Sequence, residues 1–490
     1  MKKNHYIAFA LILFAFVVAS SALLSRGHNW GDDFASYIMQ AKSIDTGTEK
    51  IFFEQNSFTI HESSNVIGPV AYPWGYPLIL SIFYAVFGLN PLALKIPNIL
   101  FFVLFLIVFY KLLRKRLSPW EGILLVSILA FNPQFFSSQN QILSDIPFLF
   151  FSTLSVFLID RFVGENKEFP PSPINNLILG VSIFWAIFVR TTGIILILTL
   201  LLCQIIVIRQ QWKEIIKRPR ILLAYLLPYF VAGGLWLAFS LILPSGESSY
   251  LLQFSSSTFI TSLKDNISYY FHLMEQFLTG LPSVQILYGF LLAFLLIGLI
   301  AKSKKDYTLI IYSVFTIGLY LLWPAEQGLR FIFPIIPLFV YFSFQGMKTG
   351  FSSLDGNYRK AGMAISYLFW VVVLIVFVAN SGKLIQANLE TNRQESGPFD
   401  TYSAEMFKFI RTDTPSTSVI VFFKPRVMHL LTDRNAIRIY TCNELMRGDY
   451  IVLVKTNLGN QIPIDKIGSC GLDTLQEFEN NNFVVYKLIK

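Results

Sequence analysis

Long apolar runs separated by short polar segments are the feature that most restricts what this chain can fold into. The first run, Tyr6 to Leu24, is long enough for a helix to cross the roughly 30 Å hydrocarbon core of a bilayer. Hydrophobic residues make up 54% of the chain and charged residues 14%, which excludes an ordinary soluble protein. Further runs follow at 95–112, 120–137, 145–161, 174–189, 193–208, 221–243, 284–301, 307–323, 331–347 and 362–380. The sequence therefore predicts a polytopic all-α membrane protein with about eleven spans within residues 1–380.

The apolar stretch from Ile174 to Ile208 is too long to be one span. As a single helix its 35 residues would extend about 52 Å, at 1.5 Å per residue, well beyond the hydrocarbon thickness. We expect the chain to fold back at Arg190–Gly193. Arg190 would then lie near one membrane face, where an arginine requires water or a partner.

Basic residues are distributed unequally between the two sides that alternate spans define. Up to residue 380, one side carries nineteen lysines and arginines and the other carries seven. Because these residues concentrate in cytoplasmic loops, the richer side, with the N-terminus, is predicted to be cytoplasmic. The same asymmetry accounts for the net charge of +9 without a nucleic-acid partner. The chain is thus expected in the plasma (inner) membrane, with a long first outer loop over residues 25–76.

Two outward-facing regions are predicted to have structure of their own. The segment YPWGYPLILSIFYAVFG is too short to cross a bilayer alone, which indicates a juxtamembrane helix at the first outer loop. Residues 381–490 have the composition of a soluble domain and predict a small extracytoplasmic α/β domain. Its Cys442 and Cys470 are able to pair if the domain lies outside the cytoplasm. Its expected elements are a helix over 402–410 and strands that start at Ser418, Ile437, Asp449 and Asn482.

The segment GDDFASYIMQA, Gly31 to Ala41, follows the first span and begins with two adjacent carboxylates. Asp32 and Asp33 open a helix-like run, and Tyr37 falls on the same face as Asp33. One interpretation is that these acids stabilise a helix N-terminus. The other is that a carboxylate in an outer cleft accepts a proton from an attacking hydroxyl.

Three more polar positions lie at predicted outward ends of spans. Asp145 follows Ser144 in SQNQILSDIP, Arg190 lies in VRTTG, and Arg330 lies in AEQGLRFIFPIIP. Asp145 is either a helix cap or a site residue. The arginines either extend into lipid headgroups or bind a lipid-linked phosphate, to which a guanidinium offers two parallel hydrogen bonds. No histidine or cysteine spacing resembles a metal site, so no cofactor is predicted. A divalent metal ion stays an open alternative that the adjacent, rather than Asp-x-Asp, carboxylates do not favour.

Five segments in order, GDDFASYIMQA, YPWGYPLILSIFYAVFG, LSDIPFLFF, FVRTTG and LRFIFPIIP, resemble the GT-C class of integral-membrane glycosyltransferases. The branch they resemble contains protein O-mannosyltransferases and the lipid A aminoarabinose transferase. The resemblance implies a polyprenyl-phosphate sugar donor and inverting transfer to an acceptor on the outer face. It selects Asp33 over Asp32 as the general base, because the acid of the family is followed by an aromatic residue and an alanine at the positions of Tyr37 and Ala41.

The resemblance also implies substrate-binding roles for Tyr37, Asp145, Arg190 and Arg330. The aminoarabinose transferase has a lysine where this chain has Tyr72, which is therefore a further candidate. The acceptor is a lipid, a glycan or a protein. Hydropathy alone leaves two alternative functions open. One is a lipid or sugar transporter or flippase, and the other is an O-antigen polymerase-like protein. A transporter would favour inverted repeats and interrupted helices at the midplane, whereas the polar residues here gather at one face.

Overall fold

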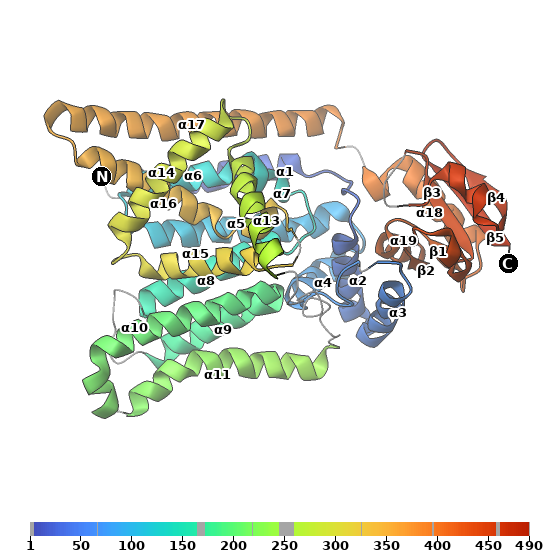
Figure 1. The fold of residues 1–490 in the computed structure, drawn as a ribbon, viewed down its shortest axis with the longest axis horizontal. Helices are drawn as coiled ribbons and strands as arrows, with labels where there is room; N and C mark the ends of the chain where they lie inside the picture. Colours follow the sequence, from blue (N-terminus) through green and yellow to red (C-terminus); the bar gives the residue numbers. More distant parts are fainter. Residues whose placement is uncertain are drawn as a thin grey trace.

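The computed structural model describes residues 4–489 apart from 66, 164–171, 218, 245–258, 325, 394–395 and 457–460. A bundle of helices forms most of the molecule, and a small sheet with its own helices lies at one end of it (Figure 1). The N-terminus lies at the opposite end of the bundle. The helices of the bundle are α1 (Asn4–Leu23), α5 (Pro91–Leu113), α6 (Pro119–Ala130), α7 (Pro133–Ser138), α8 (Asp145–Phe162), α9 (Pro173–Val189), α10 (Ile195–Lys217), α11 (Pro219–Ile242), α13 (Phe259–Leu273), α14 (Val284–Lys302), α15 (Tyr307–Leu321), α16 (Ile336–Ser352) and α17 (Gly356–Glu390).

The described chain contains six helical stretches long and apolar enough to cross a membrane. Shorter apolar helices accompany them, and α8 carries charged residues at both of its ends. The structure therefore supports a mostly helical membrane protein, but the predicted number of about eleven spans is not confirmed. The six stretches are Asn4–Leu23, Pro91–Leu113, Thr191–Arg209, Leu223–Ile242, Val284–Lys302 and Gly356–Glu390.

The predicted span over 120–137 is wrong, because two helices occupy it. Pro133 has no amide hydrogen with which to continue α6. The side-chain oxygen of Asn132 accepts hydrogen bonds from the amides of Gln134 and Phe135, which starts α7 instead. The Asn132 amide group also donates to the carbonyl of Phe277 at 2.8 Å, so the break is fixed by the surrounding bundle.

The segment between α1 and α5, which begins with the predicted first outer loop, forms three helices at the end of the bundle that carries the sheet. These are α2 (Asp32–Thr46), α3 (Glu49–His61) and α4 (Gly75–Phe87), and α2 packs against α4. Gly75 lies so close to α9 that a Cβ added to it would be 2.6 Å from the backbone of Phe188. The buried ammonium of Lys95 donates to the carbonyls of Ser25 and Gly27, at 2.9 and 2.6 Å. These bonds fix the irregular segment that leads into α2.

The C-terminal domain is a five-stranded sheet with the order β2-β1-β3-β5-β4. β1 is parallel to β2 and β3, whereas β5 is antiparallel to β3 and β4. Cys442 and Cys470 form a disulfide. The α17 helix continues to Glu390, past the predicted domain boundary at residue 380. The elements of the domain are α18 (Thr401–Asp413), β1 (Val419–Val421), α19 (Pro425–Thr432), β2 (Asn435–Ile437), β3 (Tyr450–Val454), β4 (Asp473–Glu479) and β5 (Phe483–Ile489).

Two details of this domain differ from the prediction. The second strand ends at Ile437, where the predicted strand begins, because pairing with β1 fixes its register. β4 was absent from the prediction because it is an edge strand whose largely exposed residues include polar side chains on both faces.

The helices α14 and α16 touch through glycines, which yields a test of the packing. A Cβ added at Gly298 would overlap the carbonyl oxygen of Phe342, so Gly298→Ala is expected to push the helices apart. We expect this variant to lose about 1–3 kcal/mol of stability and to unfold at a lower temperature in detergent. Gly289→Ala, on the same helix with open space around the added Cβ, is the control and should unfold no earlier than wild type. Equal unfolding temperatures for the two variants would contradict this close packing.

Candidate active site

The carboxylate of Asp33 makes two short contacts at the start of α2. Its Oδ2 lies 2.7 Å from Nη2 of Arg330, which belongs to the short 3-10 helix Leu329–Ile332 before α16. Its Oδ1 accepts a hydrogen bond of 2.7 Å from the hydroxyl of Tyr72. Side-chain exposure is 30% for Asp33 and 35% for Arg330, so this pair remains accessible. Residues nearly 300 positions apart in sequence thus form one charged contact.

A second ion pair lies deeper beside the first. Asp145, in the first turn of α8, pairs with Arg190 at the turn between α9 and α10, and their side chains are 5% and 13% exposed. The other carboxylate oxygen of Asp145 lies 3.8 Å from Nη1 of Arg330. Both guanidinium groups lie over the ring of Phe331, at 4.3 Å for Arg190 and 5.1 Å for Arg330. The two arginines are therefore built into the protein and do not extend freely into headgroups.

These residues line one cavity of about 290 Å³ at the end of the bundle nearest the C-terminal domain. Tyr37 also lines it, and the Tyr37 hydroxyl is 2.8 Å from the hydroxyl of Ser144. The cavity therefore brings together six of the seven predicted site residues, the exception being Asp32. Its lining comprises Asp33, Tyr37, Ile67, Gly68, Tyr72, Pro73, Ser144, Asp145, Val189, Arg190, Thr191, Thr192, Trp323, Gln327, Arg330 and Phe331.

Asp32 points away from this cavity toward the C-terminal domain. It is 6% exposed, accepts a hydrogen bond of 3.3 Å from the amide of Arg426 and lies 3.6 Å from the ammonium of Lys424. Burial raises the pKa of Asp32, although Lys424 and Arg426 act in the opposite direction. For Asp33, burial also favours the neutral acid, but Arg330 and the Tyr72 hydroxyl outweigh it and hold the pKa below its ordinary value. The two adjacent carboxylates thus have different environments.

The C-terminal domain contributes a residue that sequence reasoning missed. Arg426, at the start of α19, is fully buried, and its guanidinium lies 5.5 Å from the ring of Tyr72. It also donates to Asn56 of α3 at 3.2 Å, so it joins the domain to α3 on the side of Tyr72, the residue that donates to Asp33. No spacing in the sequence indicates this contact, because Arg426 is more than 350 residues from Tyr72 and Asn56.

The carboxylates of this site are bound to cations of the protein. Within the described ranges, no group of three or more His, Cys, Asp or Glu residues is placed to hold a metal ion. What the arrangement offers chemically is an ionised carboxylate beside two fixed guanidinium groups, which suits proton removal next to a developing negative charge.

Comparison with known proteins shows which architecture this is. The family model of dolichyl-phosphate-mannose-protein mannosyltransferases matches residues 71–236. The structure of ArnT from Cupriavidus metallidurans bound to undecaprenyl phosphate matches over 97% of both chains, with a TM-score of 0.57 and 12% identity. The chain has the GT-C glycosyltransferase fold. AglB from Archaeoglobus fulgidus, in complex with an inhibitory peptide and a dolichol-phosphate, shares this GT-C fold over 92% of this chain and 70% of its own, at 12% identity and a TM-score of 0.55.

The GT-C resemblance predicted from the five segments is thereby confirmed. No curated protein sequence matches this chain. The region matched by the family model contains Tyr72, Asp145 and Arg190 but neither Asp33 nor Arg330. The roles of the last two residues therefore depend on the geometry described above.

Proposed function

We propose that the protein is an inverting glycosyltransferase that moves a sugar from a polyprenyl-phosphate donor to an acceptor hydroxyl, with Asp33 as the general base. The observation that carries this proposal is the joint position of Asp33, Arg330 and Arg190 in one cavity at the end of the bundle. A base and two cations in one site match a reaction that removes a proton and releases a phosphate.

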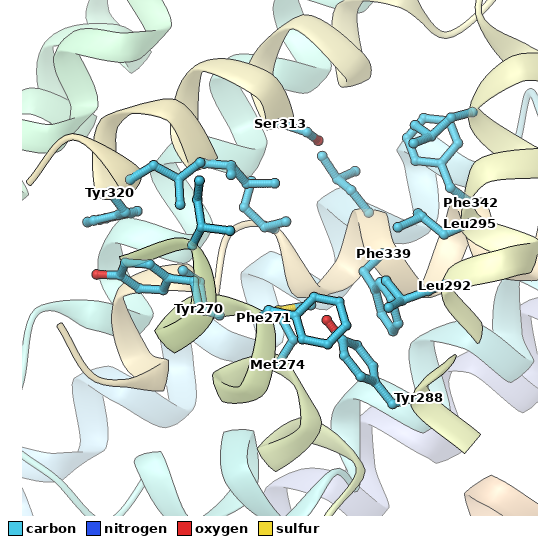
Figure 2. A pocket seen from close by; sticks show the side chains of 17 residues that line it. Tyr270, Phe271, Met274, Tyr288, Leu292, Leu295, Ser313, Tyr320, Phe339 and Phe342 are labelled. Carbon is cyan, nitrogen blue, oxygen red and sulfur yellow. The ribbon is translucent and has the colours of Figure 1, made fainter. Parts of the chain in front are cut away.

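An apolar cavity, called the groove from here on, lies beside the charged cavity and supports a lipid donor. Figure 2 shows aromatic and aliphatic side chains of α13, α14, α15 and α16 around a cavity of about 290 Å³. Tyr320 lines this groove and its ring lies 6.0 Å from that of Phe331, which lines the charged cavity. An apolar tail in the groove would place its phosphate near Arg330, and the burial of hydrocarbon would supply much of the affinity.

The ion pair between Asp33 and Arg330 suggests how the donor prepares the base. A donor phosphate that takes the hydrogen bonds of Arg330 removes the contact that lowers the pKa of Asp33. At about 4 Å and an effective dielectric of about 20, a phosphate charge and a guanidinium attract by roughly 4 kcal/mol. Asp33 thereby becomes a stronger base when the donor is in place.

The chemical step follows from this arrangement. Asp33 accepts the proton of the acceptor hydroxyl while that oxygen bonds to the anomeric carbon. The bond from that carbon to the phosphate oxygen breaks, and the electron pair leaves with the polyprenyl phosphate. Arg330 stabilises the new charge directly, while Asp145 holds Arg190 beside it. A single displacement inverts the configuration at the anomeric carbon.

We assign the reaction to the outer face of the plasma (inner) membrane, on the basis of the excess of basic residues on the other side. The site lies at the end of the bundle that carries the C-terminal domain, away from the N-terminus, which fits a cytoplasmic N-terminus and an extracytoplasmic domain (Figure 1). The acceptor is a lipid, a glycan or a protein that presents a hydroxyl at the outer face.

Mass spectrometry of lipids that co-purify with the protein tests the donor. We expect a polyprenyl phosphate or its glycosylated form, and we expect Leu292→Trp to lose it because this side chain lines the groove. Leu296→Trp, on the same helix with a 60% exposed side chain, is the matched control and should retain the lipid. Recovery of bulk phospholipids alone from wild-type protein, together with no binding of added undecaprenyl phosphate, would count against the proposed donor.

A further inference from the structure

A second cavity shares a wall with the first. It measures about 330 Å³ and lies between the start of α2 and the C-terminal domain, and Asp33 and Arg330 line both cavities. If the donor occupies the cavity with Arg190, the acceptor has to reach Asp33 from another side. The second cavity provides that approach.

The second cavity carries more positive than negative charge. Its lining includes Arg330, Lys424 and Arg438 but only two carboxylates, Asp32 and Asp33. Arg330 pairs with Asp33 at 2.7 Å, and Lys424 lies 3.6 Å from Asp32. His28, a further lining residue, adds no charge at neutral pH, because burial lowers its pKa to about 4.

Among the described residues, Arg438 is the cation of this cavity with no carboxylate oxygen within 4 Å, and Asp32 acts on its charge only at longer range. The Arg438 side chain is half-buried, and its Nε is buried without a hydrogen bond to a described residue. Its guanidinium lies 5.3 Å from the ring of Tyr440, which orients the side chain without neutralising its charge. A buried cationic donor without an acceptor is costly, and an anionic ligand would remove that cost.

The fold explains why Lys424 and Arg438 lie together. Both residues follow the carboxyl ends of the adjacent parallel strands β1 and β2, and such ends meet at one edge of a sheet. Ligands commonly bind at that edge. The N-terminus of α19 is already occupied there, since the Arg426 amide donates to Asp32. Among the described residues at this edge, Arg438 thus offers a donor without a partner, and Lys424 adds a second positive charge beside it although it also pairs with Asp32.

We infer that this second cavity binds an anionic group, a phosphate or a carboxylate, on the acceptor through Lys424 and Arg438. The inference rests on the proposed function, because it takes the ligand of this cavity to be the acceptor. The anionic group would hold the acceptor so that a hydroxyl elsewhere on it reaches Asp33. The C-terminal domain thereby selects the acceptor, while the bundle holds the donor.

Binding of inorganic phosphate to the full-length protein in nanodiscs tests this inference without requiring transfer. The protein is first saturated with undecaprenyl phosphate, so that the donor cavity is filled. We expect wild type to bind phosphate and Arg438→Gln to bind it at least about tenfold more weakly, since a charge-assisted hydrogen bond is lost. Lys487→Gln, a change of an exposed cation on β5, is the control and should bind as wild type does.

The outcomes separate the two proposals. Phosphate binding that is absent, or equal in wild type and Arg438→Gln, overturns the second site and leaves the donor proposal intact. Failure to bind undecaprenyl phosphate in the first step instead contradicts the donor proposal. Competition by glucose 1-phosphate from solution supports a soluble phosphorylated acceptor, and competition by phosphatidic acid in the nanodisc supports a lipid one. Because Lys424→Gln leaves Asp32 with one cation fewer, Arg438→Gln is the primary variant.

Discussion

Asp33→Asn is expected to lower the rate of sugar transfer by about 10²- to 10⁴-fold, the usual contribution of a general base, while the protein still folds and inserts. Asparagine keeps the size of the side chain and an oxygen that accepts the hydrogen bond from Tyr72, but it cannot take the proton of the acceptor. Single-turnover transfer from a polyprenyl-phosphate sugar in reconstituted vesicles measures the loss.

Two further variants make the result specific. Asp45→Asn changes an exposed carboxylate on the same helix and should transfer at the wild-type rate. Asp32→Asn tests the other predicted catalytic residue, which contacts Lys424 and the amide of Arg426 rather than the donor cavity. A larger loss for Asp32→Asn than for Asp33→Asn would transfer the role of base to Asp32.

Arg330→Met is expected to weaken binding of the donor lipid by about 10- to 100-fold, as for the loss of a charge-assisted hydrogen bond. Methionine retains part of the apolar contact with Phe331 but removes the charge between Asp33 and Asp145. Two carboxylates are then left near the donor phosphate with one cation fewer. Titration with undecaprenyl phosphate in detergent, with thermal unfolding as a check of folding, measures the change.

The control for this variant is Arg447→Met, because Arg447 is an exposed arginine of the C-terminal domain that pairs with Glu444. It should bind the donor as wild type does. Arg330→Lys should lie between wild type and Arg330→Met, since a lysine keeps the charge but lacks the planar fork that matches phosphate oxygens. Donor affinity of Arg330→Met equal to wild type is incompatible with the proposed phosphate contact.

The sequence predicted which residues gather but not how they pair. Hydropathy and the count of basic residues placed Asp33, Asp145, Arg190 and Arg330 on one side of a membrane, because alternate spans determine the side of each loop. They carry no information on which spans are neighbours. The prediction of two arginines available to a phosphate therefore missed that Arg190 is already paired with Asp145, and that only Arg330 lies between both carboxylates.

The contribution of the C-terminal domain was beyond sequence reasoning for a similar reason. Arg426 and Arg438 reach the site because β1, β2 and α19 place them against the first outer loop, and that docking depends on tertiary contacts across most of the chain. Two predictions of secondary structure were wrong for local reasons, one at a single residue and one over a whole strand. Asn132 ends an apolar run that looks continuous, and the exposure of β4 removes the alternation that identifies a strand.

The wall shared by the two cavities has a kinetic consequence. With no donor bound, Arg330 keeps Asp33 occupied, so an acceptor that arrives first meets a base of little strength. Under the proposed mechanism, productive turnover requires the donor to bind before the acceptor, and the departure of polyprenyl phosphate restores the Asp33–Arg330 pair. Because Asp33 would be activated before the acceptor arrives, protection of the donor from hydrolysis would depend on the acceptor, held by its own charge, displacing water from the second cavity.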